Sequence, residues 1–151
     1  MSAGPVGIGD RVGRTDRDVV MRTCDDDGRL RPVDRPLGMV DSCLFGEPAR
    51  GERLAWATTT STRDGKVWTY VVAINTATER RVIADRLDLA ALGLAGSSAV
   101  YDWRHGVVQG TDAIRTELAP RDWGLWVCAP PGERADRGEL TKYVTVPSDL
   151  G

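Results

Sequence analysis

From residue 52 onward, short apolar and β-branched runs alternate with polar turns, and this pattern most constrains the fold. Two of these runs, RLAWATTTST and KVWTYVVAIN, flank Arg63, Asp64 and Gly65. An Asp-Gly pair between two strand-like runs is a strong short-range signal for a β-hairpin. Further short runs with turn signals at similar spacing follow. Together they predict that residues 52–146 form an antiparallel β-sandwich.

The run KVWTYVVAIN is apolar on both of its faces. One face carries Trp68, Tyr70, Val72 and Ile74. A strand with two apolar faces is covered on both sides, so this run predicts a central strand. We expect Trp68 and Val72 to be buried together with Ile114 and Leu118, which lie on the apolar face of the later run AIRTEL.

The remaining runs supply the other strands of the predicted sandwich. RRVIAD predicts a strand, whereas the leucines of LDLAALGL fit neither a helical nor a strand period and predict an irregular turn at one end. AVYDWR and GVVQG are expected to pair across His105 and Gly106. AIRTEL alternates between apolar and polar residues, which places it nearer an edge or solvent. DWGLWVCAP and TKYVTV are expected to be the closing strands.

Composition excludes several classes of protein. The chain has 151 residues, 41% of them hydrophobic, which is enough to bury a sizeable core. Its 20 basic and 22 acidic residues are spread along the sequence, so no basic block suggests a nucleic-acid partner. The apolar runs are too short to span a membrane, and the N-terminus lacks a secretory signal pattern. We therefore expect a cytoplasmic protein with neither a nucleic-acid nor a membrane partner.

The cysteines predict neither a metal site nor a disulfide framework. Cys24, Cys43 and Cys128 are widely spaced, and His105 is the single histidine, whereas zinc sites need clustered Cys or His ligands. We expect buried or half-buried free thiols in a reducing compartment, with no metal and no cofactor. A nucleophilic pair of Cys128 and His105 stays open as an alternative, although no third group nearby would orient the histidine.

The chain before the sandwich has a different character. Residues 5–10 predict a short strand that ends at Gly-Asp, and Asp16 can cap a helix over RDVVMRTC. Gly28 is the expected terminator of that helix. A strand, a glycine-rich turn and a helix are half of a β/α repeat. We assign residues 1–30 to such a unit and residues 31–51 to a connector.

The segment SAGPVGIGDRVGRTDRDVVMRTCDDDGRLRPVDRPLGMVDSCLF resembles the last barrel repeat and exit segment of glycoside hydrolase family 36. That family contains α-galactosidases and the plant raffinose and stachyose synthases. In its pattern a Gly-Gly-Pro strand ends in Asp and a DCLF stretch follows later. Here Ala3-Gly4-Pro5, Asp10 and residues 41–45 stand at those places. The α-galactosidases of family 27 have a related strand, and AVYDWRHGVV and RDWGLWVCAP look like strands of the C-terminal sandwich of such enzymes.

The resemblance implies a mainly β chain with one strand–helix unit in front. Residues 1–30 would be the last repeat of a (β/α)8 barrel, residues 31–51 a connector and residues 52–151 an antiparallel sandwich. A complete barrel needs ~250 residues, and the two catalytic carboxylates of the family come from its earlier strands. We therefore expect no catalytic residue in this chain and no hydrolysis by it alone. The implied partner is an α-galactoside held by a complete barrel.

Asp10 and Arg11 are the candidate substrate-binding residues. Asp10 would lie at the end of the eighth barrel strand, on the face where barrel active sites are built. There it would contact a sugar hydroxyl or orient a loop. The alternative is a turn aspartate that accepts backbone N–H bonds. We also expect Asn75 to cap a turn, and Asp102 to have a role at the surface or in its hairpin rather than in catalysis.

The five tryptophans bear on a second candidate function, a free-standing carbohydrate-binding sandwich, which needs a row of exposed aromatic side chains on one face. Trp68, Trp103 and Trp126 lie in alternating apolar runs and are expected in the core. Trp56 and Trp123 are left open; Trp123 follows Arg121 and Asp122 at a strand start, where an indole can be either exposed or buried. A truncated gene product without chemistry is the third candidate.

Residues 4–27 are expected to be the least self-sufficient part of the chain. A barrel strand is normally paired on both sides, and its neighbours are absent from this sequence. An unpaired strand edge favours association, and a lone repeat buries too little apolar area to offset its loss of chain entropy. We expect local disorder or self-association through this segment.

Overall fold

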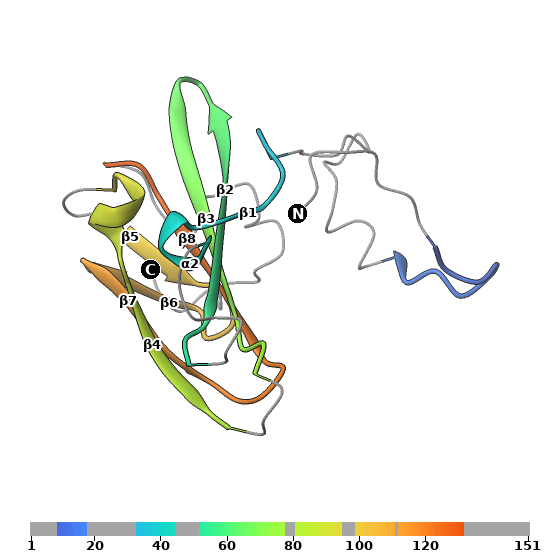
Figure 1. The fold of residues 1–151 in the computed structure, drawn as a ribbon. Coiled ribbons are helices and arrows are strands. Elements are labelled where there is room, and N and C mark those ends of the chain that lie inside the picture. Colours follow the sequence, from blue (N-terminus) through green and yellow to red (C-terminus); the bar gives the residue numbers. More distant parts are fainter. Residues whose placement is uncertain are drawn as a thin grey trace.

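The computed structural model describes residues 9–17, 33–44, 52–77, 81–94, 99–110 and 112–131. The elements named below are numbered as in Figure 1. They are β1 (Gly38–Met39), α2 (Asp41–Leu44), β2 (Ala55–Arg63), β3 (Lys66–Ile74), β4 (Ile83–Asp88), η2 (Leu89–Leu92), β5 (Ala99–Asp102), β6 (Val107–Gly110), β7 (Ala113–Leu118) and β8 (Trp123–Cys128).

The strands form two antiparallel sheets that pack face to face. One sheet has six strands in the order β1-β2-β3-β8-β5-β6, and the other pairs β4 with β7. In Figure 1 the β4–β7 ribbon runs in front of the larger sheet, with η2 at its upper end. The mainly β, antiparallel sandwich predicted from the sequence is thus confirmed. The strand–helix unit expected in front of it, and the closing strand TKYVTV, lie largely or wholly outside the described residues.

Both predicted hairpins are present. β2 and β3 pair from Ala55↔Ile74 to Arg63↔Lys66, and the two residues between them, Asp64 and Gly65, have φ values of 50° and 74°. Positive φ at both positions is the requirement of the tightest hairpin turn, which explains the Asp-Gly pair. β5 and β6 pair across the turn that contains Gly106, at φ 68°.

The inner core lies between the two sheets. The larger sheet contributes Trp56, Val71, Ala73, Val100, Trp126 and Cys128, and the smaller sheet with η2 contributes Ile83, Leu87, Leu89, Ile114 and Leu118. A second buried cluster lies on the opposite face of the six-stranded sheet and contains Trp68, Tyr70, Tyr101, Leu125, Val127 and Ala129. β3 therefore has apolar partners on both faces and neighbours on both edges, as a central strand requires.

One packing prediction is wrong. Trp68 belongs to the outer cluster, with Val72 packed against it, whereas Ile114 and Leu118 belong to the inner core. The reason is the alternation of side chains along a strand. Val71 and Ala73 are the residues of β3 that face the second sheet, so their even-numbered neighbours point away from it.

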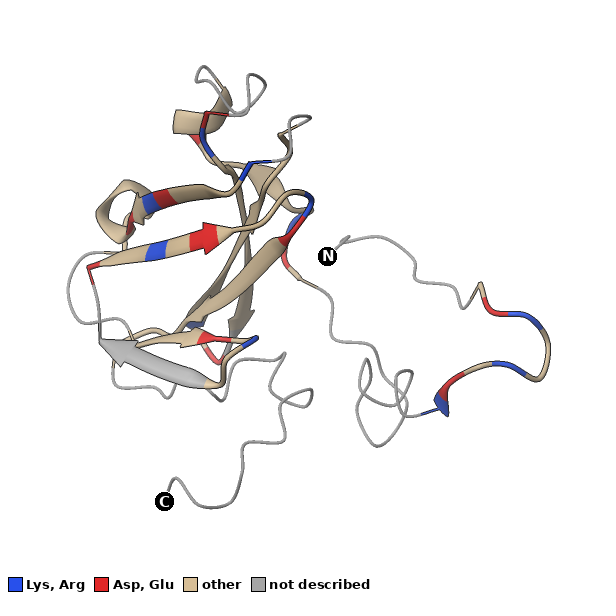
Figure 2. Cartoon of the chain, turned by 90° about the horizontal axis from the view of Figure 1, so that it is seen from below, with Lys and Arg blue, Asp and Glu red and all other residues tan. Residues whose placement is uncertain are grey.

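The ends of the second sheet match their sequence patterns. LDLAALGL forms the 3-10 helix η2, which buries Leu89 and ends at Gly93 in the left-handed conformation. β7 is an edge of a two-stranded sheet, with Arg115 and Glu117 exposed, as the alternation of AIRTEL predicts. In Figure 2 basic and acidic residues are interspersed along β4 and β7, without a face of one sign in that view.

Candidate functional site

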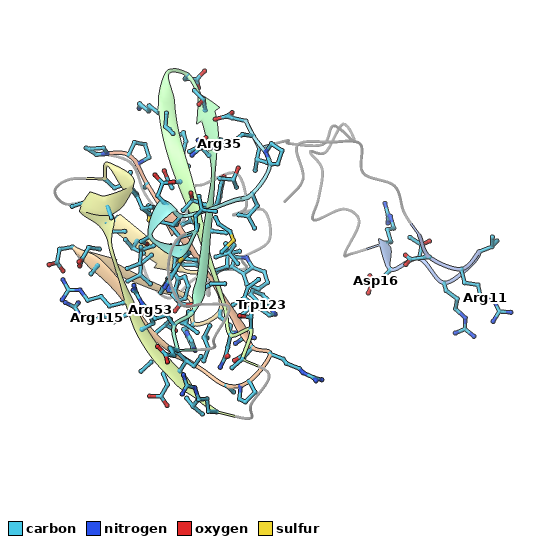
Figure 3. All side chains as sticks on the ribbon, viewed as in Figure 1. Arg11, Asp16, Arg35, Arg53, Arg115 and Trp123 are labelled. Carbon is cyan, nitrogen blue, oxygen red and sulfur yellow. The ribbon has the colours of Figure 1, made fainter. Side chains whose placement is uncertain are left out.

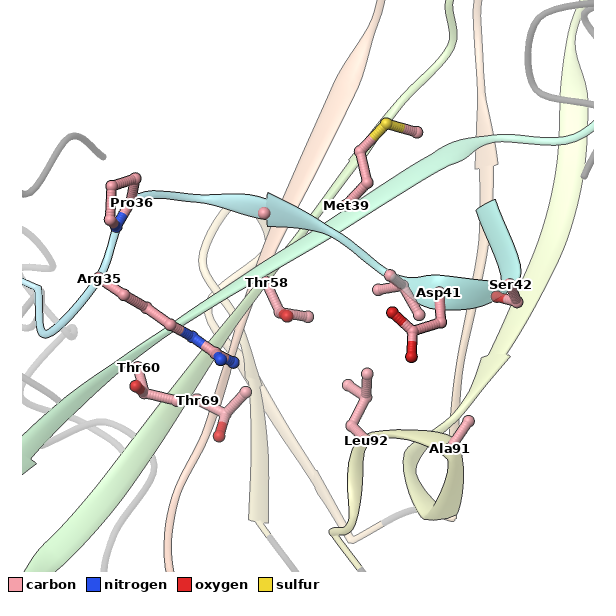
Figure 4. Close-up of a pocket in the computed structure, with 12 residues that line it drawn as sticks. Arg35, Pro36, Met39, Asp41, Ser42, Thr58, Thr60, Thr69, Ala91 and Leu92 are labelled. Atoms are coloured by element: carbon pink, nitrogen blue, oxygen red, sulfur yellow. The ribbon is translucent and has the colours of Figure 1, made fainter. Parts of the chain in front are cut away.

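A polar cleft opens beside the inner core, where threonines replace the apolar side chains of the larger sheet. Thr58 and Thr60 follow Trp56 on the same face of β2, and Thr60 is paired with Thr69 of β3. These three threonines line a cavity of about 520 Å³. Segment 35–42 forms one wall, and Ala91 with Leu92 of η2 forms the other (Figure 4). This volume is typical of small-molecule sites.

The segment that carries the first wall is tied to β2 at several points. Asp34 accepts hydrogen bonds from the Thr62 amide (3.0 Å) and hydroxyl (2.8 Å). The hydroxyl of Thr59 donates to the carbonyl of Arg35. The Val40 amide donates to the Trp56 carbonyl at 2.9 Å. Part of the expected connector thus forms β1, a pre-positioned edge of the larger sheet.

Hydrogen bonding, opposed by burial, controls the protonation of Asp34. The Thr62 hydroxyl is the strongest influence, and the Thr62 amide, the Thr60 hydroxyl and the charge of Arg35 act in the same direction. Together they hold the pKa of Asp34 below its ordinary value. The Asp34 carboxylate is therefore ionised at neutral pH and keeps the wall of the cleft anchored.

Two side chains of opposite charge face the cleft from this wall. Figure 4 shows Arg35 reaching across the floor toward Thr69, and the Asp41 carboxylate turned toward Leu92. Neither forms an ion pair with another residue in the described part of the chain. The cleft thus offers a guanidinium, a carboxylate, three threonine hydroxyls and the hydroxyl of Ser42. This set can bind a ligand through hydrogen bonds, but it holds no activated nucleophile.

A second polar cluster organises the β5–β6 turn. The carboxylate of Asp102 accepts hydrogen bonds from the amides of Arg104 (2.9 Å) and His105 (3.0 Å), and from the Trp126 indole at 3.2 Å. Nδ1 of His105 lies 2.9 Å from the same carboxylate. The expected hairpin role of Asp102 is confirmed by these contacts.

Trp123 is the exposed indole of the molecule, with 40% of its surface accessible. Arg104 covers part of the ring, 4.8 Å from its centroid, and forms two hydrogen bonds to Asp122 at 2.8 and 3.0 Å. Trp103 lies against the same ring, 5.9 Å away between centroids. Of the five tryptophans the other four are buried or half-buried, so they do not form the row of exposed indoles that a free-standing lectin needs.

Asp10 and Arg11 lie in the described segment 9–17, and both are exposed. The carbonyl of Arg11 accepts a bond from the Arg14 amide at 2.8 Å, which closes a turn. Figure 3 places Arg11 away from the sandwich and from Arg35. The structure therefore does not bring the two candidate residues to the cleft, and their role in substrate binding stays a prediction.

The two described cysteines, Cys43 and Cys128, are free and buried, as expected. Burial raises the pKa of Cys128 to about 12, so its thiolate is not available at neutral pH. His105 contacts Asp102 instead, and the nucleophilic pair considered from the sequence lacks its first member. Within the described ranges, no group of His, Cys, Asp or Glu could hold a metal ion. None of the helices described there is long and apolar enough to cross a membrane.

The cleft was not among the sites predicted from the sequence, although a signal for it was present. Along one face of RLAWATTTST, Trp56 is followed by Thr58 and Thr60, which marks the change from an apolar to a polar floor. Asp85 was not predicted either; its side chain is 9% exposed and connects the two sheets. An aspartate inside a strand-like run that otherwise alternates is the corresponding signal.

Comparison with known proteins gives partial structural matches, three of which are described here. The sequence matches no protein-family model and no curated protein sequence. A GH27 β-L-arabinopyranosidase from Geobacillus stearothermophilus is 16% identical over 68% of this chain, with a TM-score of 0.49. A protein assigned as an α-N-acetylgalactosaminidase from Bacillus halodurans is 14% identical over 62%, with a TM-score of 0.44. One assigned as an α-galactosidase/melibiase from Bacteroides fragilis is 18% identical over 48%, with a TM-score of 0.35.

The matched regions are small parts of these glycosidases. This chain covers 21%, 20% and 16% of their respective lengths. The identities and TM-scores are too low to assign an activity or a family, so the fold assignment rests on the sheet topology described above.

Proposed function

We propose that this chain is a non-catalytic, C-terminal part of an α-galactosidase-like glycoside hydrolase. The observation that supports the proposal most strongly is the order of two parts along the chain. The segment up to residue 45 resembles the end of a family 36 barrel, and an antiparallel sandwich of two sheets follows it. In the proposal residues 1–30 belong to the barrel and residues 52–151 to the sandwich. The proposal has three more specific parts. They are membership of family 36 rather than family 27, an α-galactoside as substrate of the complete enzyme, and a cytoplasmic location.

The carboxylates of the described sandwich support a non-catalytic role. Glycosidases need two carboxyl groups roughly 5–9 Å apart across the sugar, one of them free to exchange a proton. Asp85, Asp102 and Asp122 are each held by several hydrogen bonds in turns and ion pairs. In the cleft, Asp41 is the single carboxylate among the described lining residues. None of these four described carboxylates therefore has the free partner carboxylate that a glycosidase acid/base pair needs.

The activity test uses the purified full chain and 4-nitrophenyl α-D-galactopyranoside. We expect no release of nitrophenol above the buffer control, while a complete α-galactosidase in a parallel reaction hydrolyses the substrate. Turnover by the chain that Asp10→Asn abolishes would contradict the proposal, because it would place a catalytic carboxylate within this sequence.

The genomic context tests the other half of the proposal. A reading frame that encodes the earlier barrel repeats directly upstream would support it, and co-expression of that frame with this chain should restore α-galactoside hydrolysis. If such a frame is missing, the truncated gene product without chemistry becomes the better interpretation.

A further inference from the structure

We propose that the cleft between β1, the β2–β3 floor and η2 binds an uncharged polyhydroxylated ligand, a single sugar unit, through hydrogen bonds. The proposal rests on the proposed function only for the choice of a galactoside among sugars. Its physical basis is the set of polar groups that converge on one cavity from three separate elements, together with the rigid attachment of the wall that carries the charged ones.

The charges of the cleft favour a neutral ligand. Arg35 and Asp41 contribute one positive and one negative charge, so an anion or a cation would be attracted by one side chain and repelled by the other. A hydroxyl group can accept from a guanidinium or donate to a carboxylate, and such charge-assisted bonds are stronger than neutral ones. Neighbouring hydroxyls on one ring can use both groups at once.

The floor of the cleft supplies neutral partners of the same kind. A threonine hydroxyl donates one hydrogen bond and accepts two. The Thr60 hydroxyl bonds to Asp34, which leaves it as an acceptor toward the cleft. Thr69 lines the cavity although only 7% of its surface is exposed, so its hydroxyl stands in a largely dehydrated position. Leu92 offers apolar surface for the C–H groups of a sugar ring.

The cleft is formed before any ligand arrives. The contacts of Asp34, Arg35 and Val40 with β2 fix the wall, and the β2–β3 pairing fixes the floor. Binding therefore loses little freedom of the chain, which offsets the lack of an aromatic platform. A free amino acid would use Arg35 and Asp41 but leave the threonines without partners. A sulfate would use Arg35 alone.

The test is an NMR titration of the ¹⁵N-labelled full chain with methyl α-D-galactopyranoside, L-serine and sodium sulfate in separate series. We expect saturable shifts with the galactoside, with a Kd on the order of 1–10 mM, as befits a small hydrogen-bonded ligand. The shifted amides should be those of the lining residues, and serine and sulfate should leave them unchanged. A galactoside series without saturable shifts there, or tighter binding of serine or sulfate, would overturn the proposal.

Substitutions identify the groups that bind. Arg35→Ala and Thr69→Val should each weaken galactoside binding about tenfold, because each removes a hydrogen bond to the ligand. Arg115→Ala is the matched control: this arginine is exposed on β7 and lies away from Arg35 in Figure 3. Equal affinity of all three variants would refute the assignment to the cleft. Spectra of the free variants report folding separately from binding.

This titration is independent of the activity test. Absence of galactoside binding would remove the sugar site while leaving the non-catalytic sandwich proposal in place. Hydrolysis by the chain would overturn that proposal and leave the binding measurement unaffected.

Discussion

Replacing Asp85 should lower the stability of the sandwich more than replacing an exposed residue does, because Asp85 connects the two sheets. Asp85 lies on β4, and its carboxylate accepts hydrogen bonds from the amide of Leu54 (3.1 Å), directly before β2, and from the indole of Trp56 (3.0 Å), in β2. The Arg86 amide at 2.8 Å and the guanidinium of Arg53 at 3.1 Å complete its contacts. The side chain is only 9% exposed.

The expected cost follows from the donors that Asp85→Ala leaves behind. Leu54 and Trp56 are both 0% exposed, so water cannot reach their N–H groups after the substitution. A buried donor without a partner costs about 1–3 kcal/mol, which gives about 2–6 kcal/mol for the two. Arg53 is half exposed and regains water, so it adds little. A loss of this size is a large part of the stability of an ordinary domain.

Urea unfolding followed by tryptophan fluorescence measures this cost. The matched control is Asp88→Ala on the same strand, whose exposed carboxylate pairs with Arg86. We expect the control to change the free energy of unfolding by less than about 0.5 kcal/mol. If Asp85→Ala costs no more than the control, the hydrogen bonds to Leu54 and Trp56 do not hold the sheets together.

The same residue predicts a pH dependence. Burial alone would raise the pKa of Asp85, but the bonds from Trp56, Arg86, Arg53 and Leu54 outweigh it and hold the pKa below its ordinary value. The unfolded chain therefore takes up this proton at a higher pH than the folded chain. The stabilisation is complete above the ordinary carboxyl pKa and is lost as the pH falls through the folded value. Asp85→Asn should flatten the acid limb of the stability curve, and an unchanged limb would contradict this.

Three further substitutions or probes test the packing. Cys43 and Cys128 should resist alkylation by iodoacetamide until the chain unfolds, because both are buried and burial raises the pKa of Cys128 to about 12. Peptide mass mapping of the native protein after treatment checks this. Rapid labelling of either cysteine in the native protein would contradict it. Gly124→Ala should lower the free energy of unfolding in urea by about 1–3 kcal/mol, because the added Cβ would lie 2.3 Å from the Trp126 ring. If the variant is as stable as the wild type, Gly124 and the Trp126 ring are not in such close contact. Asn75→Ala should lower the free energy of unfolding by about 2–3 kcal/mol in the same assay. The Asn75 side chain is 1% exposed, donates hydrogen bonds to two carbonyls and accepts one from an amide.

The strands were predictable because their signals are local. The Asp64–Gly65 turn, the alternation of AIRTEL and the two apolar faces of β3 each depend on neighbours along the chain. The partner of each face is a different matter. Trp68 and Trp126 are both tryptophans in alternating runs, yet they lie on opposite faces of one sheet. Only the position of the second sheet decides which face is the inner one.

The wall of the cleft, unlike its threonine floor, was not predictable for a related reason. Arg35 and Asp41 lie in a stretch that reads as a connector, and they become part of a site only because residues 38 and 39 pair with β2. The position of this segment against β2 depends on long-range hydrogen bonds. One of them runs from the Thr59 hydroxyl to the Arg35 carbonyl and joins residues 24 positions apart. No local pattern in the sequence encodes them.

The central claim is that the sandwich is self-sufficient and that residues 1–30 belong to a different fold. Thermal unfolding of the chain with and without these residues, together with the mass of each in solution, tests it most directly. We predict that the midpoint changes by less than about 4 °C, equivalent to under ~1 kcal/mol, and that any self-association is lost with the segment. If the truncated chain loses most of its stability, residues 1–30 are an integral part of one compact domain, and the interpretation of them as a barrel repeat is wrong.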